Sequence, residues 1–336
     1  MVSMQKLLTN CNAGILLVLC WLAFALHDPA VATESAPLSL NPLSQHATIN
    51  LNQSREPIRP IASRSDLSAT KVALGEKLFN DRRLDSNQHI ACGDCHNLEL
   101  GGTDQLAFSV NGAGNPTRFN TPTIFNVGLN TQYYWSGKFE TLDEQLTDAL
   151  VEINTTWPQL VRTISAVPEY VDEFNKIYSD GITKNNIRDA LISFELSLAT
   201  PDSPFDRYLK GDATALTATE LQGYRLFKSY GCVSCHQGVN IGGNFVLQLD
   251  KLGAPFGNLN STRNRLQGKL QQIRVPSLRN VARTPPYFHD GSATTLRQAV
   301  SRMVDEYLGI GVDEQQVSLI VDFLKTLTGQ YKGQSL

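Results

Sequence analysis

The chain has 336 residues, 18% of them charged, and a formal net charge of −3. This weakly acidic balance lacks the excess of lysine and arginine with which nucleic-acid-binding domains hold phosphates, which argues against nucleic acid as a partner. The length is enough for two domains.

A secretory signal peptide is predicted at residues 1–32. Lys6 precedes an apolar run at residues 13–26, and the small-residue sequence Ala30-Val31-Ala32 offers a cleavage site. The run is shorter than the ~20 residues that a membrane-spanning helix needs. We therefore expect an exported, periplasmic protein, cleaved near Ala32 and left without a transmembrane anchor. An uncleaved N-terminal anchor is the alternative.

Residues 33–64 are predicted to form an extended N-terminal arm, because they are rich in Pro, Ser and Asn and show no clear hydrophobic period. Two domains follow, at residues 65–203 and 204–336, with Pro201-Asp202-Ser203-Pro204 as the break between them. Helical spacing and capping boxes predict an all-α fold with long Gly/Asn/Pro-rich loops. The predicted helices lie at residues 72–79, from 142 onward, and at 184–198, 218–227 and 296–308.

Two short sequences are typical of covalently attached c-type haem, CGDCH at residues 92–96 and CVSCH at residues 232–236. Two thiols three positions apart reach the two vinyl groups of one porphyrin, and the adjacent imidazole becomes the proximal ligand of the iron. A redox dithiol or half of a zinc site is the alternative, but a histidine follows both times and the pairs are 140 residues apart. The residues predicted to hold two haem c groups are Cys92, Cys95, His96, Cys232, Cys235 and His236.

The two halves of the chain repeat each other, which indicates one small helical, cytochrome c-like haem domain in each. Upstream of the two motifs, Gly75, Leu78 and Phe79 correspond to Gly223, Leu226 and Phe227. Downstream, with a constant offset of 154 residues, the matches are Pro122 with Pro276, Asn126 with Asn280, Gly137 with Gly291, Thr141 with Thr295 and Leu142 with Leu296.

The repeat predicts that the two irons differ on the side opposite the proximal histidine. Met303 is the only methionine left after cleavage, and as a ligand it would raise the potential of the second haem and close it to small molecules. Packing in the core is its alternative role. The equivalent residue in the first half is Ala149, which cannot bind iron, so the first haem should be open even when oxidised. Glu152, one helical turn further on, could move a proton during peroxide cleavage, or could be an ordinary surface glutamate.

Trp135 and His289 also occupy equivalent positions in the repeat. Trp135 could belong to the core, or its indole could couple the two haem domains electronically. His289 could bind iron, hydrogen-bond a haem propionate or serve a structural role. A tryptophan at the equivalent position favours the propionate-binding or structural role.

These features resemble the bacterial di-haem cytochrome c peroxidases and the related methylamine-utilisation di-haem proteins. The resemblance covers nearly all of the chain after residue 65. It rests on CGDCHNL at residues 92–98, NTPTIFN at 120–126, VEIN at 151–154, GCVSCHQG at 231–238 and PSLRNV at 276–281. The combination of these sequences, rather than any one of them, is specific.

The resemblance implies that the first haem is the peroxidatic one and that the second, with Met303, receives the electrons. It also implies that Glu152 is the catalytic glutamate, Gln145 an active-site glutamine and Trp135 the inter-haem tryptophan. A calcium site between the domains is implied at Asn120 and at backbone oxygens near Thr284 and Pro286.

The chain departs from the family in the Gly-rich loop near Gly112. Many members carry a histidine there that caps the peroxidatic haem until the other haem is reduced, and this loop has none. The segment from Gln145 to Glu152 is also shorter than in relatives. Met303 stands where the methylamine-utilisation branch has tyrosine, which favours the peroxidase branch.

The sequence therefore predicts a di-haem peroxidase that reduces hydrogen peroxide with electrons from a small redox protein, a cytochrome c or a cupredoxin. Two other functions stay open. One is a non-enzymatic di-haem electron carrier, and the other is a methylamine-utilisation-like oxidase of a protein or organic substrate. The oligomeric state also stays open, with a homodimer as one alternative.

Overall fold

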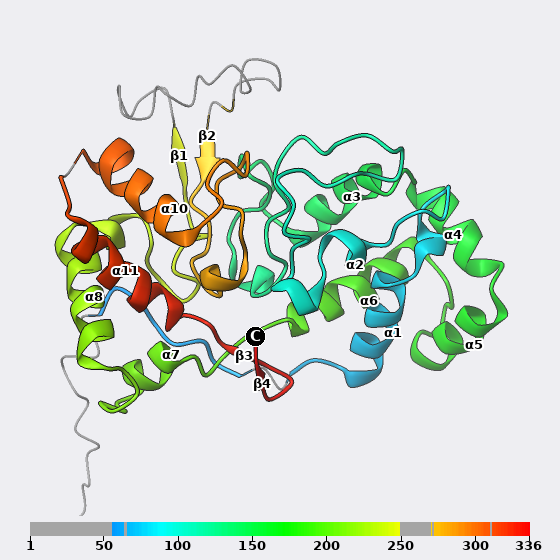
Figure 1. The fold of residues 1–336 in the computed structure, drawn as a ribbon. Coiled ribbons are helices and arrows are strands. Elements are labelled where there is room, and N and C mark those ends of the chain that lie inside the picture. The colour runs from blue at the N-terminus through cyan, green and yellow to red at the C-terminus, as the bar shows by residue number, and fades with distance from the viewer. Residues whose placement is uncertain (1–55, 64–65, 249–269, 271, 310) are drawn as a thin grey trace, which may run out of the picture. The chain divides into compact units, whose positions relative to one another are not determined.

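The computed structural model describes residues 56–63, 66–248, 270, 272–309 and 311–336. The predicted signal peptide and all but the last part of the predicted arm lie outside the described residues. The fold is helix-rich, as predicted, with few strands (Figure 1). Among the described residues, none of the helices is both long and apolar enough to span a membrane.

The α-helices are α1 (Ala69–Phe79), α2 (Cys92–Cys95), α3 (Leu142–Glu152), α4 (Trp157–Ser165), α5 (Pro168–Ile177), α6 (Lys184–Ser197), α7 (Pro204–Leu209), α8 (Ala218–Ser229), α10 (Leu296–Arg302) and α11 (Glu314–Lys325). A π-helix, η9 (Met303–Leu308), continues α10. The short 3-10 helices are η2 (Arg82–Leu84), η3 (Leu98–Leu100), η4 (Val127–Leu129), η5 (Cys232–Ser234) and η8 (Val281–Arg283). Two antiparallel pairs join β1 (Val246–Gln248) to β2 (Gln272–Arg274) and β3 (Gln330–Tyr331) to β4 (Gln334–Ser335).

The helices predicted from capping boxes are confirmed. The Thr141 hydroxyl accepts a hydrogen bond from the Glu144 N–H at 3.2 Å, and the Glu144 carboxylate accepts one in return from the Thr141 N–H. Thr217 and Glu220 form the same pair of bonds at the start of α8. These bonds satisfy N–H groups that have no partner inside the helix, so each helix begins there.

The structure differs from the prediction at residues 296–308. The α-helical hydrogen-bonding pattern ends at Arg302 and continues as a π-helix from Met303. Single π-turns within α-helices are frequent at functional sites. Helices α4, α5, α7 and α11 and both strand pairs were not predicted.

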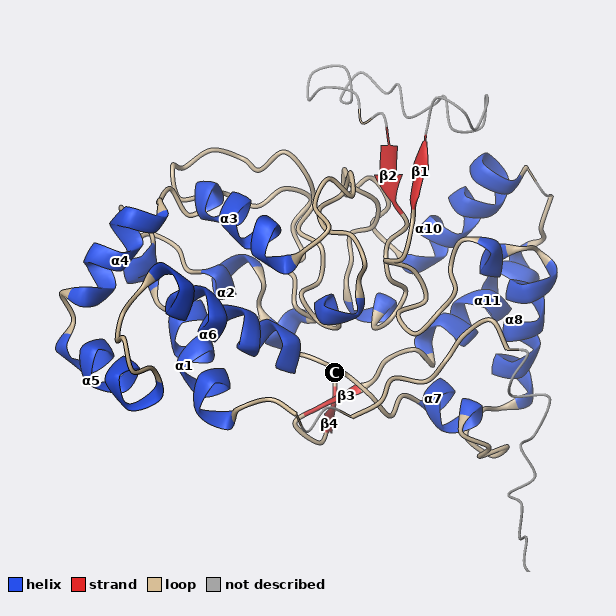
Figure 2. Ribbon diagram, turned by 180° about the vertical axis from the view of Figure 1, so that it is seen from behind, coloured by secondary structure: helices blue, strands red, loops and turns tan. Residues whose placement is uncertain are grey.

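Both halves are built around the same helix crossing. Helix α1 packs against α6 in the first half and α8 against α11 in the second, as Figure 1 and Figure 2 show from opposite sides. A Cβ atom at Gly75 or Gly223 would overlap a backbone carbonyl of the facing helix, that of Ala190 or Leu319. Glycine at both positions lets the helix backbones approach closely, which explains why both halves contain it.

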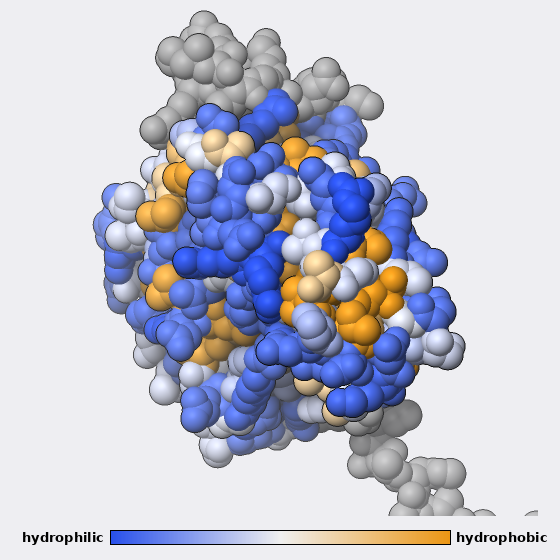
Figure 3. Space-filling view, turned by 90° about the vertical axis from the view of Figure 1, so that its right-hand side faces the viewer, coloured by the Kyte–Doolittle hydropathy of each residue, from blue (hydrophilic) through white to orange (hydrophobic). Residues whose placement is uncertain are grey.

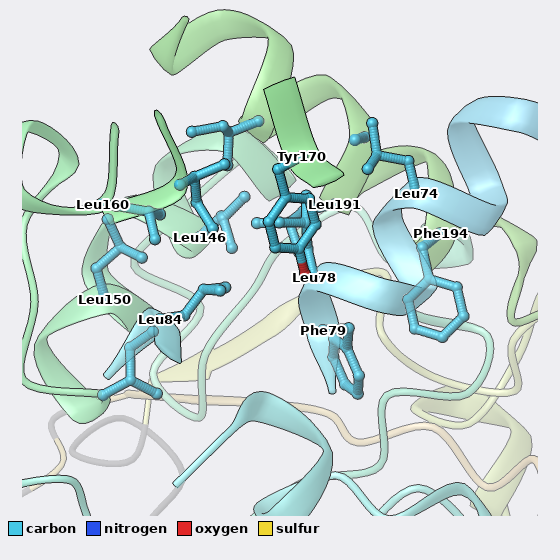
Figure 4. Close-up of a cluster of buried hydrophobic side chains, with 14 of the residues drawn as sticks. Leu74, Leu78, Phe79, Leu84, Leu146, Leu150, Leu160, Tyr170, Leu191 and Phe194 are labelled. Carbon is cyan, nitrogen blue, oxygen red and sulfur yellow. The ribbon is translucent and has the colours of Figure 1, made fainter. Parts of the chain in front are cut away.

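Each half has its own cluster of buried apolar side chains. In the first, Leu78, Tyr170 and Phe194 bring together α1, α5 and α6 (Figure 4). In the second, the ring centroids of Phe205 and Phe323 lie 5.0 Å apart in an edge-on arrangement. Such aromatic pairs add to the stabilisation that comes from burying apolar area.

Each end of the described chain packs against the apolar cluster of the opposite half. Ile58, which precedes α1, is only 1% exposed and belongs to the second cluster. The adjacent Pro57 carbonyl accepts a hydrogen bond from the Gly238 N–H at 2.9 Å. At the other end, the ring of Tyr331 in β3 packs against the first cluster, 5.2 Å from the Phe125 ring. These two segments tie the halves together.

The repeat-equivalent residues Asn126 and Asn280 meet at one hydroxyl group between the halves. Both have left-handed backbones, with φ of 61° and 60°. Their side-chain amides donate to Thr200 Oγ1 at 2.7 Å and 2.9 Å. The internal repeat predicted from the sequence is therefore also present in backbone conformation and hydrogen bonding.

Figure 3 shows one face of the molecule, which is mainly hydrophilic with hydrophobic residues gathered in limited patches. Val151 at 70% exposed and Val110 at 53% are among the most exposed large apolar side chains of the described residues. They directly precede Glu152 and Asn111, which line a cavity of the first half. Apolar surface therefore flanks this cavity.

Candidate functional site

The first CxxCH sequence forms a single helical turn, α2, which places both thiols on one side. The Asp94 carboxylate holds this turn, because it accepts from the Ala91 N–H at 2.8 Å and from Arg82 at 2.8 Å and 3.1 Å. The His96 N–H closes the turn on the Cys92 carbonyl at 2.9 Å.

The second sequence has the same closing bond, from the His236 N–H to the Cys232 carbonyl at 2.9 Å. The two imidazoles are also held alike. Nδ1 of His96 lies 3.4 Å from the Gly102 carbonyl oxygen, and Nδ1 of His236 lies 3.4 Å from that of Ile241. A carbonyl partner at Nδ1 fixes the ring and leaves Nε2 as the nitrogen for a metal.

Burial sets the charge state of these histidines. It lowers the pKa of His236 to about 4 and also lowers the pKa of His96. Both rings are therefore neutral near pH 7, which is the form that binds a metal.

The cysteines lie in surroundings that disfavour a thiolate. Burial raises the pKa of Cys92 to about 12 and the pKa of Cys95 and Cys232 to about 11, and it raises that of Cys235 as well. Reactive and metal-binding cysteines have depressed pKa values instead. The surroundings of the four cysteines therefore suit uncharged thioethers. The two motifs line two different cavities, which argues against a zinc site shared between them.

The first cavity brings the α2 motif together with one face of α3. Cys92, Cys95 and His96 form part of its wall. Gln145, Ala149 and Glu152 line it from α3, where spacings of four and three residues put them on one helix face. The residues predicted from the sequence and from the family resemblance thus lie in one cavity.

Glu152 ends α3, and its side chain is exposed. Its backbone carbonyl accepts a hydrogen bond from the Gly112 N–H at 2.7 Å. The Gly-rich loop therefore lies directly against the end of α3. Within that loop, the Asn111 side-chain oxygen accepts from the N–H groups of Ala113 and Asn115 at 3.2 Å and 3.0 Å, which folds the loop onto itself.

The second cavity contains the second motif and the end of α10. Cys232, Cys235 and His236 line it together with Met303, the first residue of the π-helix. His289 also lines it and is buried, at 3% exposed. The change from α-helix to π-helix therefore occurs at the residue predicted as an iron ligand.

Both cavities meet at Trp135, which lines each of them and is 7% exposed. Its indole N–H donates to the Asn120 carbonyl at 2.7 Å. Its ring lies edge-on to that of His289, with centroids 6.2 Å apart. The tryptophan is therefore fixed between the two cavities.

The residues implied as a calcium site come together only in part. Asn120, Thr284 and Pro286 all line the second cavity. The Asn120 amide nitrogen donates to the Leu106 carbonyl at 2.7 Å, and within the part of the chain that the structure describes no hydrogen bond reaches its Oδ1. The Asn120 Oδ1 is thus not occupied by a hydrogen bond within the described structure, as coordination of a cation requires.

Two buried ionisable residues of the first cavity were missed by the sequence analysis. Glu195 on α6 is 6% exposed, its Oε2 has no hydrogen-bond partner among the described residues, and burial raises its pKa to about 8. The sequence indicated its burial, because Glu195 follows Leu191 by four residues and so lies on the same, buried face of α6. Arg274, 5% exposed at the end of β2, lines both cavities, and no local pattern marks it.

Each cavity fits a haem held by two thioethers and a histidine. The attachment residues line the cavities, and the imidazoles are neutral and oriented. In the first cavity, Glu195 Oε2 has no hydrogen-bond partner among the described residues, and the Arg274 side chain donates to them only through Nε. The second cavity adds Met303, whereas the first has Ala149 on the matching helix.

Comparison with known proteins agrees with this geometry. A sequence profile of the family described as di-haem cytochrome c peroxidase matches residues 69–214. The cytochrome c551 peroxidase of Nitrosomonas europaea is 37% identical over 303 residues, which cover 87% of this chain and 90% of that protein. The cytochrome c peroxidase Ccp of Escherichia coli is 35% identical over 327 residues, which cover 94% of this chain and 67% of that protein.

Among solved structures, a MauG-like protein associated with microbial copper homeostasis is similar, with a TM-score of 0.65 and 26% identity, over 81% of this chain and 93% of that chain. This likeness extends across both halves of the fold. Together with the two peroxidases, it means that the chain belongs to the di-haem cytochrome c peroxidase family.

Proposed function

We propose that the protein reduces hydrogen peroxide to water with electrons from a small redox protein, a cytochrome c or a cupredoxin. The observation that carries this proposal is the difference between two otherwise matching cavities. Met303 faces the second, and Ala149 and Glu152 face the first. One site is suited to electron transfer, and the other leaves room for a substrate.

In the first cavity, a haem bound through Cys92, Cys95 and His96 would supply the iron and the electrons for cleaving the O–O bond. Ala149 leaves space on the α3 side. The Glu152 carboxylate, at the mouth of the cavity, takes a proton from the entering peroxide and delivers it to the departing oxygen as water forms. Gln145, one turn before Ala149, orients the peroxide through its amide group.

The second cavity receives the electrons. His236 and Met303, which line this cavity, would hold the haem iron there, and a methionine ligand raises the potential of a haem and closes it to small molecules. Trp135 lies between the two cavities and carries the electronic coupling between them. His289 serves a propionate-binding or structural role beside Trp135, and the contact between their rings supports this role.

The remaining parts of the proposal concern maturation and assembly. Two haem c groups are attached covalently in domains at residues 65–203 and 204–336, after export to the periplasm and cleavage near Ala32. Calcium would be held between the domains by Asn120 and by backbone oxygens near Thr284 and Pro286. A homodimer is proposed as the assembly, and sedimentation of the loaded protein tests it.

Turnover of peroxide by the haem-loaded protein, with a reduced cytochrome or a reduced cupredoxin as donor, tests the function. The intact mass must first exceed the cleaved polypeptide by two haems. Donor oxidation that depends on peroxide supports the proposal. Electron exchange without peroxide turnover would identify a carrier, and turnover only with a protein or organic substrate would identify an oxidase.

A further inference from the structure

Arg274 is a buried cation at the boundary between the two cavities. Its side chain is 5% exposed and lines both. Its backbone N–H donates to the Trp135 carbonyl at 2.8 Å, and its Nε donates to the Tyr134 carbonyl at 3.1 Å. These two bonds fix the base and the stem of the guanidinium beside Trp135.

The two terminal nitrogens of Arg274 stand in contrast to those of Arg279, the other arginine buried to this degree in the described structure. In Arg279 every guanidinium nitrogen is used: Nε donates to the Val239 carbonyl at 3.0 Å, one terminal nitrogen donates to Asp206 at 2.8 Å, and the other donates to the Arg59 carbonyl at 2.9 Å. For Arg274, the described residues provide neither a carboxylate nor a hydrogen bond at the terminal nitrogens.

A buried guanidinium in this state is costly, because the charge has left water and has gained no counter-ion. Burial accordingly lowers the pKa of Arg274 to about 10, even though the electrostatic interaction with Tyr133 raises it. The missing partner must be an anion that enters from the cavities. Each haem of the proposed function brings two propionate carboxylates, and a planar guanidinium binds carboxylates more firmly than other side chains do.

We propose that Arg274 binds a propionate of the haem in each cavity and is the shared counter-ion of the two. With Nε committed to Tyr134, four N–H groups on two nitrogens remain, enough for one carboxylate on either side. The inference rests on the haem assignment of the proposed function. It adds a residue that positions both haems and links their reduction potentials.

The consequence is electrostatic. A positive charge beside a haem disfavours the more positive ferric state, and it also neutralises the propionates, which favour that state. Loss of the charge from Arg274 therefore lowers both reduction potentials. A residue that contacted the haem of only one cavity would change only one reduction potential.

The test compares Arg274→Gln with Arg283→Gln, which removes the same charge from an exposed site outside both cavities. Haem content is measured first, and a wild-type protein without two haems would contradict the proposed function rather than this inference. In spectroelectrochemical titrations, both midpoints should fall in Arg274→Gln and neither should move in Arg283→Gln. Unchanged midpoints, or a shift of one haem alone, would overturn the shared role.

Arg274→Lys keeps the charge but loses the planar fork, so it provides a second measurement if the glutamine variant does not fold. Resonance Raman spectra of the reduced protein report hydrogen bonding to the propionates. The propionate bending bands of both haems should shift in Arg274→Lys relative to the wild type. Bands identical to those of the wild type would overturn the inference.

Discussion

The indole of Trp135 and the imidazole of His289, which occupy equivalent positions in the two halves, meet edge-on with centroids 6.2 Å apart. Asn120 connects the side chain of Trp135 to the backbone of His289: the Asn120 carbonyl accepts from the Trp135 indole at 2.7 Å, and the Asn120 N–H donates to the His289 carbonyl at 2.9 Å. The internal repeat thus brings its own two copies of one position into contact, at the boundary of the two cavities.

Trp135→Phe should slow electron transfer between the haems without loss of either haem, because the indole and its hydrogen bond are lost while an aromatic ring remains. The bond to Asn120 contributes ~1 kcal/mol to stability. Stopped-flow mixing of the half-reduced protein with peroxide measures the transfer. Trp157→Phe is the matched control, since its indole also donates one hydrogen bond, to Thr147 at 3.2 Å, and it lines neither cavity. Equal transfer rates in both variants would contradict the coupling role.

Met303→Ala should lower the reduction potential of one haem and open its iron to exogenous ligands, and leave the other haem spectrally unchanged. The reason is that a thioether ligand stabilises the ferrous state. A redox titration followed by absorbance, with added cyanide or carbon monoxide as a probe of the open position, gives the measurement. A titration identical to that of the wild type would return Met303 to the role of core packing.

Glu152→Gln should retain both haems and lose most of the peroxidase activity, by ~10²–10⁴-fold, since an amide cannot transfer the proton. Glu140→Gln provides the control, because Glu140 is also an exposed glutamate near α3 but does not line the cavity. Steady-state turnover with a reduced donor is measured for both. Near-normal turnover in Glu152→Gln would make this residue an ordinary surface glutamate.

Much of this site was predictable from local sequence, because haem attachment and helix capping depend on residues a few positions apart. The CxxCH motifs and the capping boxes of α3 and α8 are of this kind. The offset of 154 residues made Ala149 the equivalent of Met303. Each of the two residues lines the cavity of its own half, from matching helices. The π-helix at Met303 was missed, since π-helices are rare and the apolar spacing of this segment is that of an ordinary α-helix.

Residues whose role arises from contacts between distant segments could not be predicted in this way. Arg274 acquires its place only when β2 pairs with the backbone of Trp135, 139 positions earlier in the chain. Glu195 interrupts the apolar face of α6, but its isolation becomes evident only when the surrounding side chains are in place. Neither side chain has a charged partner among the described residues, and burial of Glu195 favours its uncharged, protonated form.

Glu195 predicts a pH dependence of stability. Its pKa is about 8 in the folded protein against an ordinary value of 4.5. Between pH 4.5 and pH 8 the folded state keeps a proton that the unfolded state has lost, so the free energy of unfolding falls as the pH rises through this window. Glu195→Gln has the same shape without the acid, so the variant should gain stability relative to the wild type at pH 8 but not at pH 4.

Urea unfolding of the haem-loaded protein at several pH values tests this, with the exposed Glu99→Gln as control. The control should follow the wild type at every pH. A constant difference between Glu195→Gln and the wild type across the window would show that the carboxyl is ionised in the folded protein.

The first haem should be open in the resting, fully oxidised enzyme. Ala149 offers no ligand, and the loop that lies against Glu152 through Gly112 contains no histidine. In relatives whose loop histidine caps the iron, the loop must move away before peroxide can bind, which is an order-to-disorder switch. The loop of this chain has no histidine that such a movement would remove from the iron. We therefore expect a high-spin ferric EPR signal and turnover without a reductive lag.

Ala149→Met tests this by giving the first cavity a methionine at the position equivalent to Met303. The repeat places residue 149 where Met303 lies, so the added thioether should convert the first haem to a low-spin, six-coordinate state and suppress peroxide turnover, while the second haem keeps its potential. Val151→Met is the control, because the same side chain is then added at a 70% exposed position outside the cavity. Two low-spin haems in the resting wild type, with activity only after pre-reduction, would refute the open first site and leave the peroxidase assignment standing, since a capped haem still turns over once its cap is released.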